Sequence, residues 1–127
     1  MEKIPTVSVV DDDPSARSVL NRLFRSVGYV VRVFPDSESF QEADIVGETD
    51  CLILDVHLPG MSGLQLQQEL VSSNKCCPIV FISAFSDEQA RTQALENGAI
   101  EFLGKPIDFE LLLTTINQIL AKKRFED

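Results

Sequence analysis

The segment Thr6-Val7-Ser8-Val9-Val10-Asp11-Asp12-Asp13-Pro14 decides the fold of this 127-residue chain. Its first five residues are rich in β-branched side chains and form a short run, which is typical of a strand. Asp13-Pro14 then supplies a helix cap followed by a first-turn proline. Apolar residues recur at helical spacing as far as Gly28, which predicts a helix ending there: Ala16, Val19, Leu20, Leu23, Phe24 and Val27.

The same order of strand and helix repeats four more times. Alternation around Arg32 predicts a half-exposed strand over residues 31–33, followed by a short helix over 37–43. Apolar runs at 51–54 and 79–82 predict buried strands, and a short strand is expected at 101–103. The remaining helices are predicted from their apolar side chains and caps: Leu66, Leu70 and Val71; Ala90, Ala94 and Leu95, with a Ser86/Gln89 capping box and an end at Asn97-Gly98; and, from about Asp108, Phe109, Leu112, Leu113, Ile116, Ile119 and Leu120.

Five βα units predict an α/β fold, a doubly wound five-stranded parallel sheet with helices on both faces. Strands buried on both faces are apolar throughout, so the runs near 6–10, 51–54 and 79–82 belong in the middle. The runs near 31–33 and 101–103 suit the edges. Right-handed crossovers then favour the flavodoxin-like strand order 2-1-3-4-5. No linker divides residues 1–127, so we interpret the chain as one domain.

Composition argues against several classes of function. Eleven basic and twenty acidic residues give a net charge of −9, which is a poor electrostatic footprint for binding nucleic acid. The apolar runs are far shorter than the roughly 20 residues that span a bilayer, and the N-terminus lacks the apolar core of a secretory signal. Three cysteines form no C-x-x-C pair, so free thiols in a reducing compartment are expected. We predict a cytoplasmic domain that contacts neither membrane nor nucleic acid directly.

Polar side chains follow four of the five predicted strands. They are Asp11, Asp12 and Asp13 after the first strand, Asp55 at the end of the third, Ser83 at the end of the fourth and Lys105 after the fifth. Ligands of open parallel sheets bind at the carboxyl ends of the strands, so we expect these groups to meet. Clustered carboxylates call for a cation, and Mg²⁺ prefers oxygen ligands. Together with the hydroxyl and the amine, the cluster predicts in-line phosphoryl transfer, with Asp55 as the nucleophile that forms an acyl phosphate.

Four segments at matching intervals resemble the receiver domains of two-component response regulators. They are Val10-Asp11-Asp12-Asp13-Pro14, Leu54-Asp55-Val56-His57-Leu58-Pro59-Gly60-Met61-Ser62-Gly63, Ile82-Ser83-Ala84 and Phe102-Leu103-Gly104-Lys105-Pro106. The resemblance covers essentially the whole chain. The chain is similar above all to receivers that precede a helix-turn-helix output domain. This resemblance implies that the last few residues begin a linker to such a domain.

The resemblance also implies a role for each site residue. Asp55 is the phosphoacceptor; Mg²⁺ is held by Asp55, by Asp12 directly, by Asp11 through a water and by the main-chain carbonyl of His57; Ser83 and Lys105 bind the phosphoryl group; Phe102 is the switch aromatic, which turns inward; and the Lys105-Pro106 bond is cis. The donor is a phosphohistidine on a sensor histidine kinase, or a small acyl phosphate. The chain would catalyse only its own phosphorylation and slow dephosphorylation. Phosphorylation would drive homodimerisation or partner exchange through the face of the fourth helix, fifth strand and fifth helix, in the service of transcription control.

Some alternatives stay open at this point. Asp13 is interpreted as a helix cap and not as part of the site. The less usual His57 could affect how fast water removes the phosphate. Two other classes are disfavoured. A phosphohydrolase with an aspartyl-phosphate intermediate would place its acidic pair at the end of the first strand, whereas Asp55 ends the third. An FMN carrier would not tolerate three aspartates at its phosphate loop. A stand-alone or degenerate receiver that acts as an interaction module is the remaining alternative.

Overall fold

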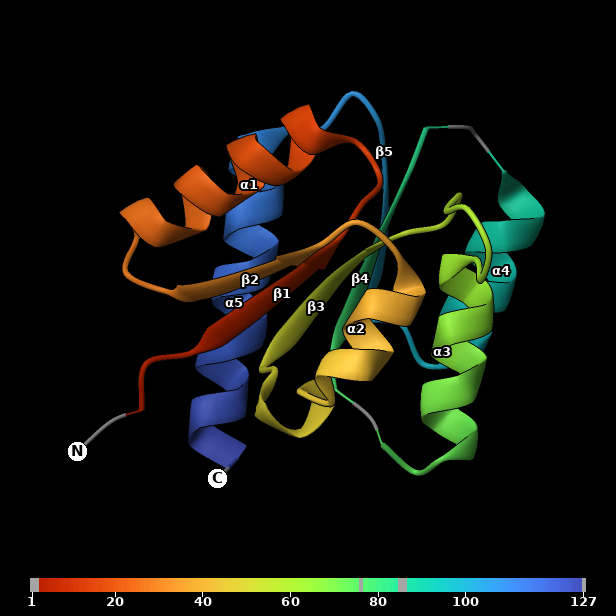
Figure 1. The fold of residues 1–127 in the computed structure, drawn as a ribbon. Helices are drawn as coiled ribbons and strands as arrows, with labels where there is room; N and C mark the ends of the chain where they lie inside the picture. Colours follow the sequence, from red (N-terminus) through yellow and green to blue (C-terminus); the bar gives the residue numbers. More distant parts are fainter. Residues whose placement is uncertain (1–2, 76, 85–86, 127) are drawn as a thin grey trace.

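The computed structural model describes residues 3–75, 77–84 and 87–126, with side chains described as far as Lys122. A five-stranded parallel sheet lies between two layers of helices (Figure 1). The strands are β1 (Thr6–Val10), β2 (Val30–Phe34), β3 (Cys51–Asp55), β4 (Ile79–Ser83) and β5 (Glu101–Gly104). The helices are α1 (Pro14–Ser26), α2 (Ser37–Ala43), α3 (Gly63–Ser72), α4 (Glu88–Glu96) and α5 (Phe109–Glu126), with a 3₁₀ turn at Val46–Glu48.

The strand order is β2-β1-β3-β4-β5, as the sequence predicted. Every residue of β1, β3 and β4 is buried, whereas β2 and β5 contain exposed positions. The continuous apolar runs therefore did mark the central strands, because a strand covered on both faces has no position left for a solvated side chain.

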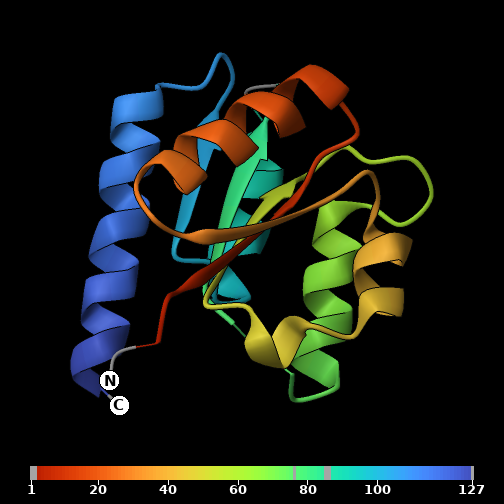
Figure 2. The ribbon, with the colours of Figure 1, turned by 60° about the vertical axis from the view of Figure 1, so that its left-hand side comes forward.

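Helices α1 and α5 cover one face of the sheet, and α2, α3 and α4 cover the other (Figure 2). Alternate residues of each central strand feed opposite cores, as the pleat requires. In β3, for example, Ile53 joins the core under α1 and α5, while Leu52 and Leu54 join the core under the other helices. The sheet is thus fixed on both sides, and its carboxyl edge is held rigidly.

Helix boundaries follow their capping residues. Asp13 caps α1 by accepting a hydrogen bond from Ser15 N, and Ser62 and Gln65 form a capping box at α3. Asp87 caps α4 by accepting from Ala90 N (3.1 Å). The predicted cap at Ser86 lies outside the described residues, and the observed cap is one residue later.

Several apolar side chains predicted to face the core lie outside it. They are Val19, Val27, Val71, Leu95 and Phe109. Each residue of a helix is rotated by about 100° from the one before, so a residue at the margin of an apolar stripe faces solvent even when its neighbours are buried. Val71, directly after buried Leu70, is 53% exposed for this reason. None of the described helices is long and apolar enough to cross a membrane.

Candidate functional site

The carboxyl ends of four neighbouring strands bring the predicted site residues together at one edge of the sheet. The parallel register pairs Val10 with Leu54 and Asp55 with Ile82, and it pairs Ser83 with Gly104. Asp11 and Lys105 follow directly after β1 and β5. Residues spread over most of the chain therefore meet because parallel strands all end at the same edge.

Three carboxylates form the centre of this edge. One oxygen from each of Asp11, Asp12 and Asp55 lies within 4.8 Å of the others. Asp11 is 0% exposed and Asp55 is 3% exposed, whereas Asp12 is open to solvent. Two nearly dehydrated carboxylates side by side repel each other unless a cation neutralises them.

Lys105 supplies part of that neutralisation. Its Nζ donates to Asp55 Oδ2 at 3.1 Å and lies 3.3 Å from Asp11 Oδ2. The Lys105-Pro106 peptide bond is cis, as predicted. One ammonium thus contacts both buried carboxylates, which leaves the cluster with more negative than positive charge.

The pKa values of the pair follow from this balance. Burial is the main reason why the pKa of Asp55 is raised; the charge of Asp11 adds to the rise, and the hydrogen bonds from Lys105 and His57 oppose it. For Lys105, burial is the largest single influence and lowers its pKa, but the combined attraction of Asp55 and Asp11 outweighs it, so the pKa of Lys105 is raised. Lys105 therefore stays protonated at neutral pH. The carboxylate form of Asp55 is stabilised less in the folded protein than it would be in water.

The backbone that follows Asp55 fixes the direction of its side chain. His57 N donates to Asp55 Oδ1 at 3.2 Å, and Gly63 N donates to Val56 O at 2.9 Å. A Cβ on Gly63 would lie 2.1 Å from the main-chain oxygen of Asp55, so only glycine allows α3 to begin this close to the site. The predicted metal contact of the His57 carbonyl has no measured counterpart and stays a prediction.

Ser83 and Phe102 lie beside Lys105 around a cavity of about 190 Å³. Ser83 is fully buried, and its main-chain oxygen accepts from Lys105 N at 2.7 Å. Phe102 already points inward, with 7% exposure and its ring centroid 6.1 Å from that of Phe81. The predicted roles of Ser83 as a phosphoryl ligand and Phe102 as a switch remain predictions.

The donor set fits Mg²⁺. Carboxylate oxygens are its preferred protein ligands, at about 2.0–2.1 Å from the ion, so ligands on opposite sides lie about 4 Å apart. The spread of up to 4.8 Å among the three oxygens closes with a small side-chain movement or with one bridging water. Apart from its 3.3 Å ion pair with the Lys105 ammonium, the buried Asp11 Oδ2 accepts no hydrogen bond from any described residue, so a carboxylate lone pair remains for this purpose.

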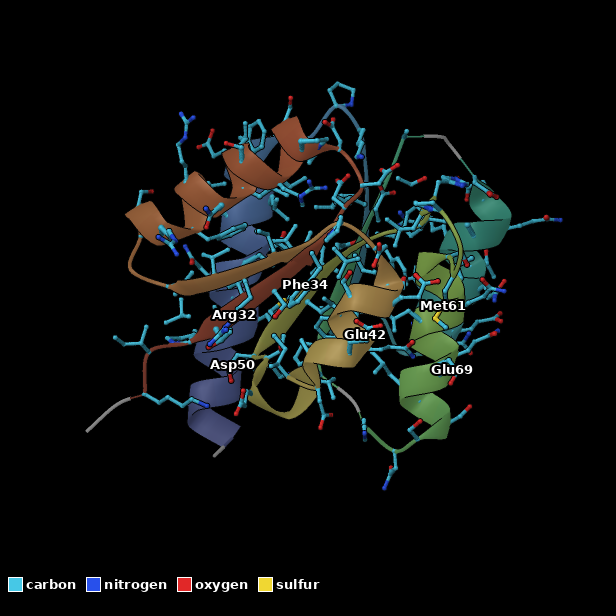
Figure 3. The ribbon with its side chains drawn as sticks, in the orientation of Figure 1. Arg32, Phe34, Glu42, Asp50, Met61 and Glu69 are labelled. Carbon is cyan, nitrogen blue, oxygen red and sulfur yellow. The ribbon has the colours of Figure 1, made fainter. Side chains whose placement is uncertain are left out.

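Sequence reasoning missed two side chains that hold the site loops. Arg17 Nη1 donates to the main-chain oxygen of Asp11 at 2.7 Å. Glu38 Oε2 accepts from the backbone N–H of Met61 at 3.0 Å. Met61, which is labelled in Figure 3, lies in the loop that leads from β3 into α3. Helical side chains lean toward the N-terminus, so an arginine in the first turns of α1 was a usable signal. Glu38 gave none, because its partner is 23 residues away.

The fold and the site define a class: an open, parallel α/β sheet with three clustered carboxylates and a lysine at the carboxyl edge of its strands. Comparison with known proteins narrows that class. The family model for the response regulator receiver domain matches residues 7–117. The chain belongs to the response regulator receiver domain family.

Individual relatives agree with this assignment. The transcriptional regulatory protein TdiR of Thauera aromatica is 43% identical over 119 residues, covering 94% of this chain and 52% of TdiR. Nodulation protein W of Bradyrhizobium diazoefficiens is 45% identical over 107 residues, covering 84% of this chain and 47% of that protein. The chain therefore spans about half the length of these relatives.

Solved structures agree on the fold. Response regulator StyR superposes with a TM-score of 0.88 at 42% identity, covering 98% of this chain and 64% of that chain. The signal receiver domain of a putative Luxo repressor protein from Vibrio parahaemolyticus reaches a TM-score of 0.90 at 22% identity, covering 98% of this chain and 96% of that one, and at this identity it bears on the fold alone.

Proposed function

We propose that this receiver domain is a phosphoacceptor switch in which Asp55 takes a phosphoryl group from a phosphohistidine of a sensor histidine kinase. The observation that carries the proposal is the contact of Lys105 Nζ with both Asp55 and Asp11, next to three carboxylate oxygens gathered within 4.8 Å. An anionic acceptor surrounded by cation-binding groups is what phosphoryl transfer requires, since the protein mainly positions the groups and stabilises charge.

The transfer step is a displacement at phosphorus. A carboxylate oxygen of Asp55 attacks, the P–N bond of the phosphohistidine breaks, and the imidazole leaves with the electron pair, so that an acyl phosphate forms. Asp11, Asp12, Asp55 and the His57 carbonyl would hold Mg²⁺, which supplies positive charge for the carboxylates and the phosphoryl oxygens. Lys105 would shift its ammonium toward the phosphoryl oxygens, and Ser83 would donate its hydroxyl to them.

The output follows from new contacts. Phosphorylation adds a charge of roughly −1.5 to −2 and three acceptor oxygens, which Ser83 and Lys105 can bind only in the phosphorylated protein. These contacts bias the loop after β4 and the position of Phe102. Exposed apolar side chains on α4, before β5 and on α5 support homodimerisation or partner exchange through this face: Leu95, Ile100, Phe109 and Leu111.

The setting of the switch completes the proposal. The domain works in the cytoplasm, makes no nucleic-acid contact itself, and controls transcription through an output domain. The similarity to TdiR, a transcriptional regulatory protein, and to the response regulator StyR supports the role in transcription control. The chain turns over no external substrate beyond its own phosphorylation and slow dephosphorylation.

The decisive experiment is incubation with acetyl phosphate and Mg²⁺, followed by intact-protein mass spectrometry. We expect the wild type to gain the mass of one phosphoryl group, and Asp55→Asn to gain none. Omitting Mg²⁺ should abolish the gain. A wild type that stays unmodified with acetyl phosphate and with histidine kinases would favour the degenerate receiver, an interaction module without phosphorylation.

A further inference from the structure

The first turns of α1 contain an arginine whose side chain reaches back to the acidic site. Arg17 is the fourth residue of α1 and is partly buried. Its guanidinium donates to the main-chain oxygen of Asp11 at 2.7 Å, a short charge-assisted hydrogen bond. The bond therefore joins the rigid helix to the turn that contains two of the three clustered carboxylates.

The peptide groups on both sides of Asp11 are held by different partners. Asp11 N donates to Phe34 O at 3.1 Å, and the Asp11 carboxylate accepts from Asp13 N at 2.9 Å. The Asp11 carbonyl belongs to the peptide unit that leads into Asp12, and Arg17 is its partner. The orientation of this peptide unit decides where the next side chain points.

Asp12 depends on that orientation more than its neighbours do. It is exposed, and among the described residues no hydrogen bond or ion pair fixes its carboxylate, whereas Asp11 and Asp55 are each held by several contacts. Its direction toward the other two acids is therefore set through the backbone.

We propose that Arg17 is a positioning residue for the cation site: by holding the Asp11–Asp12 peptide unit, it directs the Asp12 carboxylate toward Asp55. The inference rests on the proposed function, because it assumes that the three acids bind Mg²⁺. It assigns the affinity of that site partly to a side chain that touches neither the cation nor the phosphoryl group.

Charge alone predicts the opposite effect. A guanidinium near the site repels a divalent cation, so removing the positive charge of Arg17 would tighten Mg²⁺ binding if electrostatics dominated. Losing the hydrogen bond instead frees the peptide unit and weakens binding. Partners of metal ligands typically change affinity by about 10- to 100-fold when removed, which exceeds the screened repulsion expected at a partly exposed position. The sign of the change therefore separates the two effects.

The test is a calorimetric titration of the whole chain with Mg²⁺ alone. Arg17→Gln should weaken Mg²⁺ binding about tenfold. Arg17→Lys keeps the charge and one donor group, so its Mg²⁺ affinity should lie between those of Arg17→Gln and the wild type. Arg22→Gln is the matched control, because it removes the same charge from an exposed site more than one turn further along α1. It should bind as the wild type does.

A second measurement separates positioning from damage to the fold. The rate of phosphorylation by acetyl phosphate is followed against Mg²⁺ concentration. Arg17→Gln should require about tenfold more Mg²⁺ for half-maximal rate, yet reach nearly the wild-type rate at saturation. A misfolded variant would lose the saturating rate as well.

Several outcomes would overturn the inference. They are equal Mg²⁺ affinity in Arg17→Gln and Arg22→Gln, tighter binding by Arg17→Gln, or a lowered saturating rate with unchanged Mg²⁺ dependence. If Arg17→Gln does not fold, Arg17→Lys still distinguishes the two effects. A positioning role requires Arg17→Lys to bind Mg²⁺ more weakly than the wild type, whereas an effect of charge alone requires equal binding. A wild type that binds no Mg²⁺ would instead refute the proposed function itself.

Discussion

At the scale of single residues, the buried carboxylates of the site destabilise the metal-free folded state. Burial places Asp55 at 3% exposure beside the fully buried carboxylate of Asp11, and the single ammonium of Lys105 serves both. Burial therefore raises the pKa of Asp55, which means that folding disfavours its carboxylate form relative to the unfolded chain. The negative charge that the proposed phosphoacceptor needs is therefore a charge that burial in the metal-free fold disfavours.

Asp55→Asn should therefore stabilise the metal-free protein at neutral pH. The neutral amide keeps the shape of the carboxylate and removes its burial penalty and its repulsion of Asp11. Urea unfolding in EDTA, followed by circular dichroism, should show a higher free energy of unfolding than for the wild type.

The pH dependence has a definite sign. Because the folded pKa of Asp55 is raised, the wild type becomes more stable as pH falls through that pKa toward the unfolded value, and the advantage of Asp55→Asn shrinks. Saturating Mg²⁺ should also reduce or reverse it. An Asn variant less stable than the wild type in EDTA at neutral pH would contradict this account.

Tyr29 allows a second titration away from the site. Its hydroxyl donates to Asn117 Oδ1, and burial raises its pKa above the ordinary value of 10.0. It is the only tyrosine, and the chain has no tryptophan, so the ultraviolet absorbance of phenolate reports on it alone. We expect a midpoint above 10 in the folded protein and a return to about 10 in urea. The folded protein should lose stability as pH rises through 10. The reason is that the tyrosine of the unfolded chain then loses its proton, while burial keeps Tyr29 protonated in the folded state.

At the scale of elements, the start of α3 lies against the main chain at the end of β3. Gly63 lets the helix begin against the main-chain oxygen of Asp55, a contact between two backbones that no side-chain rotation can relieve. The position of the loop between β3 and α3 is thus tied directly to Asp55, the proposed phosphoacceptor.

Gly63→Ala should destabilise the fold by about 1–3 kcal/mol, because the backbone must shift to accommodate the added methyl group. The same shift should weaken Mg²⁺ binding, measured by calorimetry. Gly47→Ala is the control, since a Cβ there meets nothing within 4 Å. Equal stability of the two variants would show that α3 is not held at this contact.

The packing of α3 on α4 includes a buried amide. Gln67 Nε2 donates to the main-chain oxygen of Ala94 at 2.9 Å, while Gln67 Oε1 is buried without a partner among the described residues. The Ala94 oxygen also accepts from Ala99 N at 3.0 Å, so it keeps a hydrogen bond if the amide is removed.

Gln67→Met should consequently leave the free energy of unfolding within about 1 kcal/mol of the wild type, or raise it, because it removes an unsatisfied polar atom while keeping the volume. Leu66→Ala, at the neighbouring position, should cost about 2–5 kcal/mol. A loss of several kcal/mol in Gln67→Met would mean that the amide is a needed bridge between the helices.

At the scale of the whole molecule, signalling requires that an event at the carboxyl edge of the sheet reach an outer face. The cavity beside Ser83 and Lys105 is also lined by Arg91 of α4 and by Phe102 of β5. Arg91 Nη1 donates to Phe102 O at 3.0 Å, so α4 and β5 are joined next to the site. A change in the loop after β4 can therefore be passed to the face formed by α4, β5 and α5.

Addition of beryllofluoride and Mg²⁺ should shift the protein from monomer toward dimer, or change its partner binding, as measured by size-exclusion chromatography with light scattering. The reason is that the bound anion mimics the phosphoryl contacts to Ser83 and Lys105. Asp55→Asn should not respond, and Leu111→Glu, which places a charge on an exposed apolar position of α5, should respond less. An unchanged oligomer and unchanged partner binding in the wild type would contradict the proposed output.

The sequence by itself determined the elements, their order and the edge at which the polar groups meet. Three apolar runs identified the central strands, and the polar residues at their ends identified Asp11, Asp55 and Ser83, while Lys105 was found after the short edge strand, because period and burial leave direct traces in a chain. Only the tertiary structure decided which margin residues face solvent, such as Val71, and which distant side chain holds the loop before α3, namely Glu38. Those facts depend on helix rotation and on contacts across the chain, which no local pattern encodes.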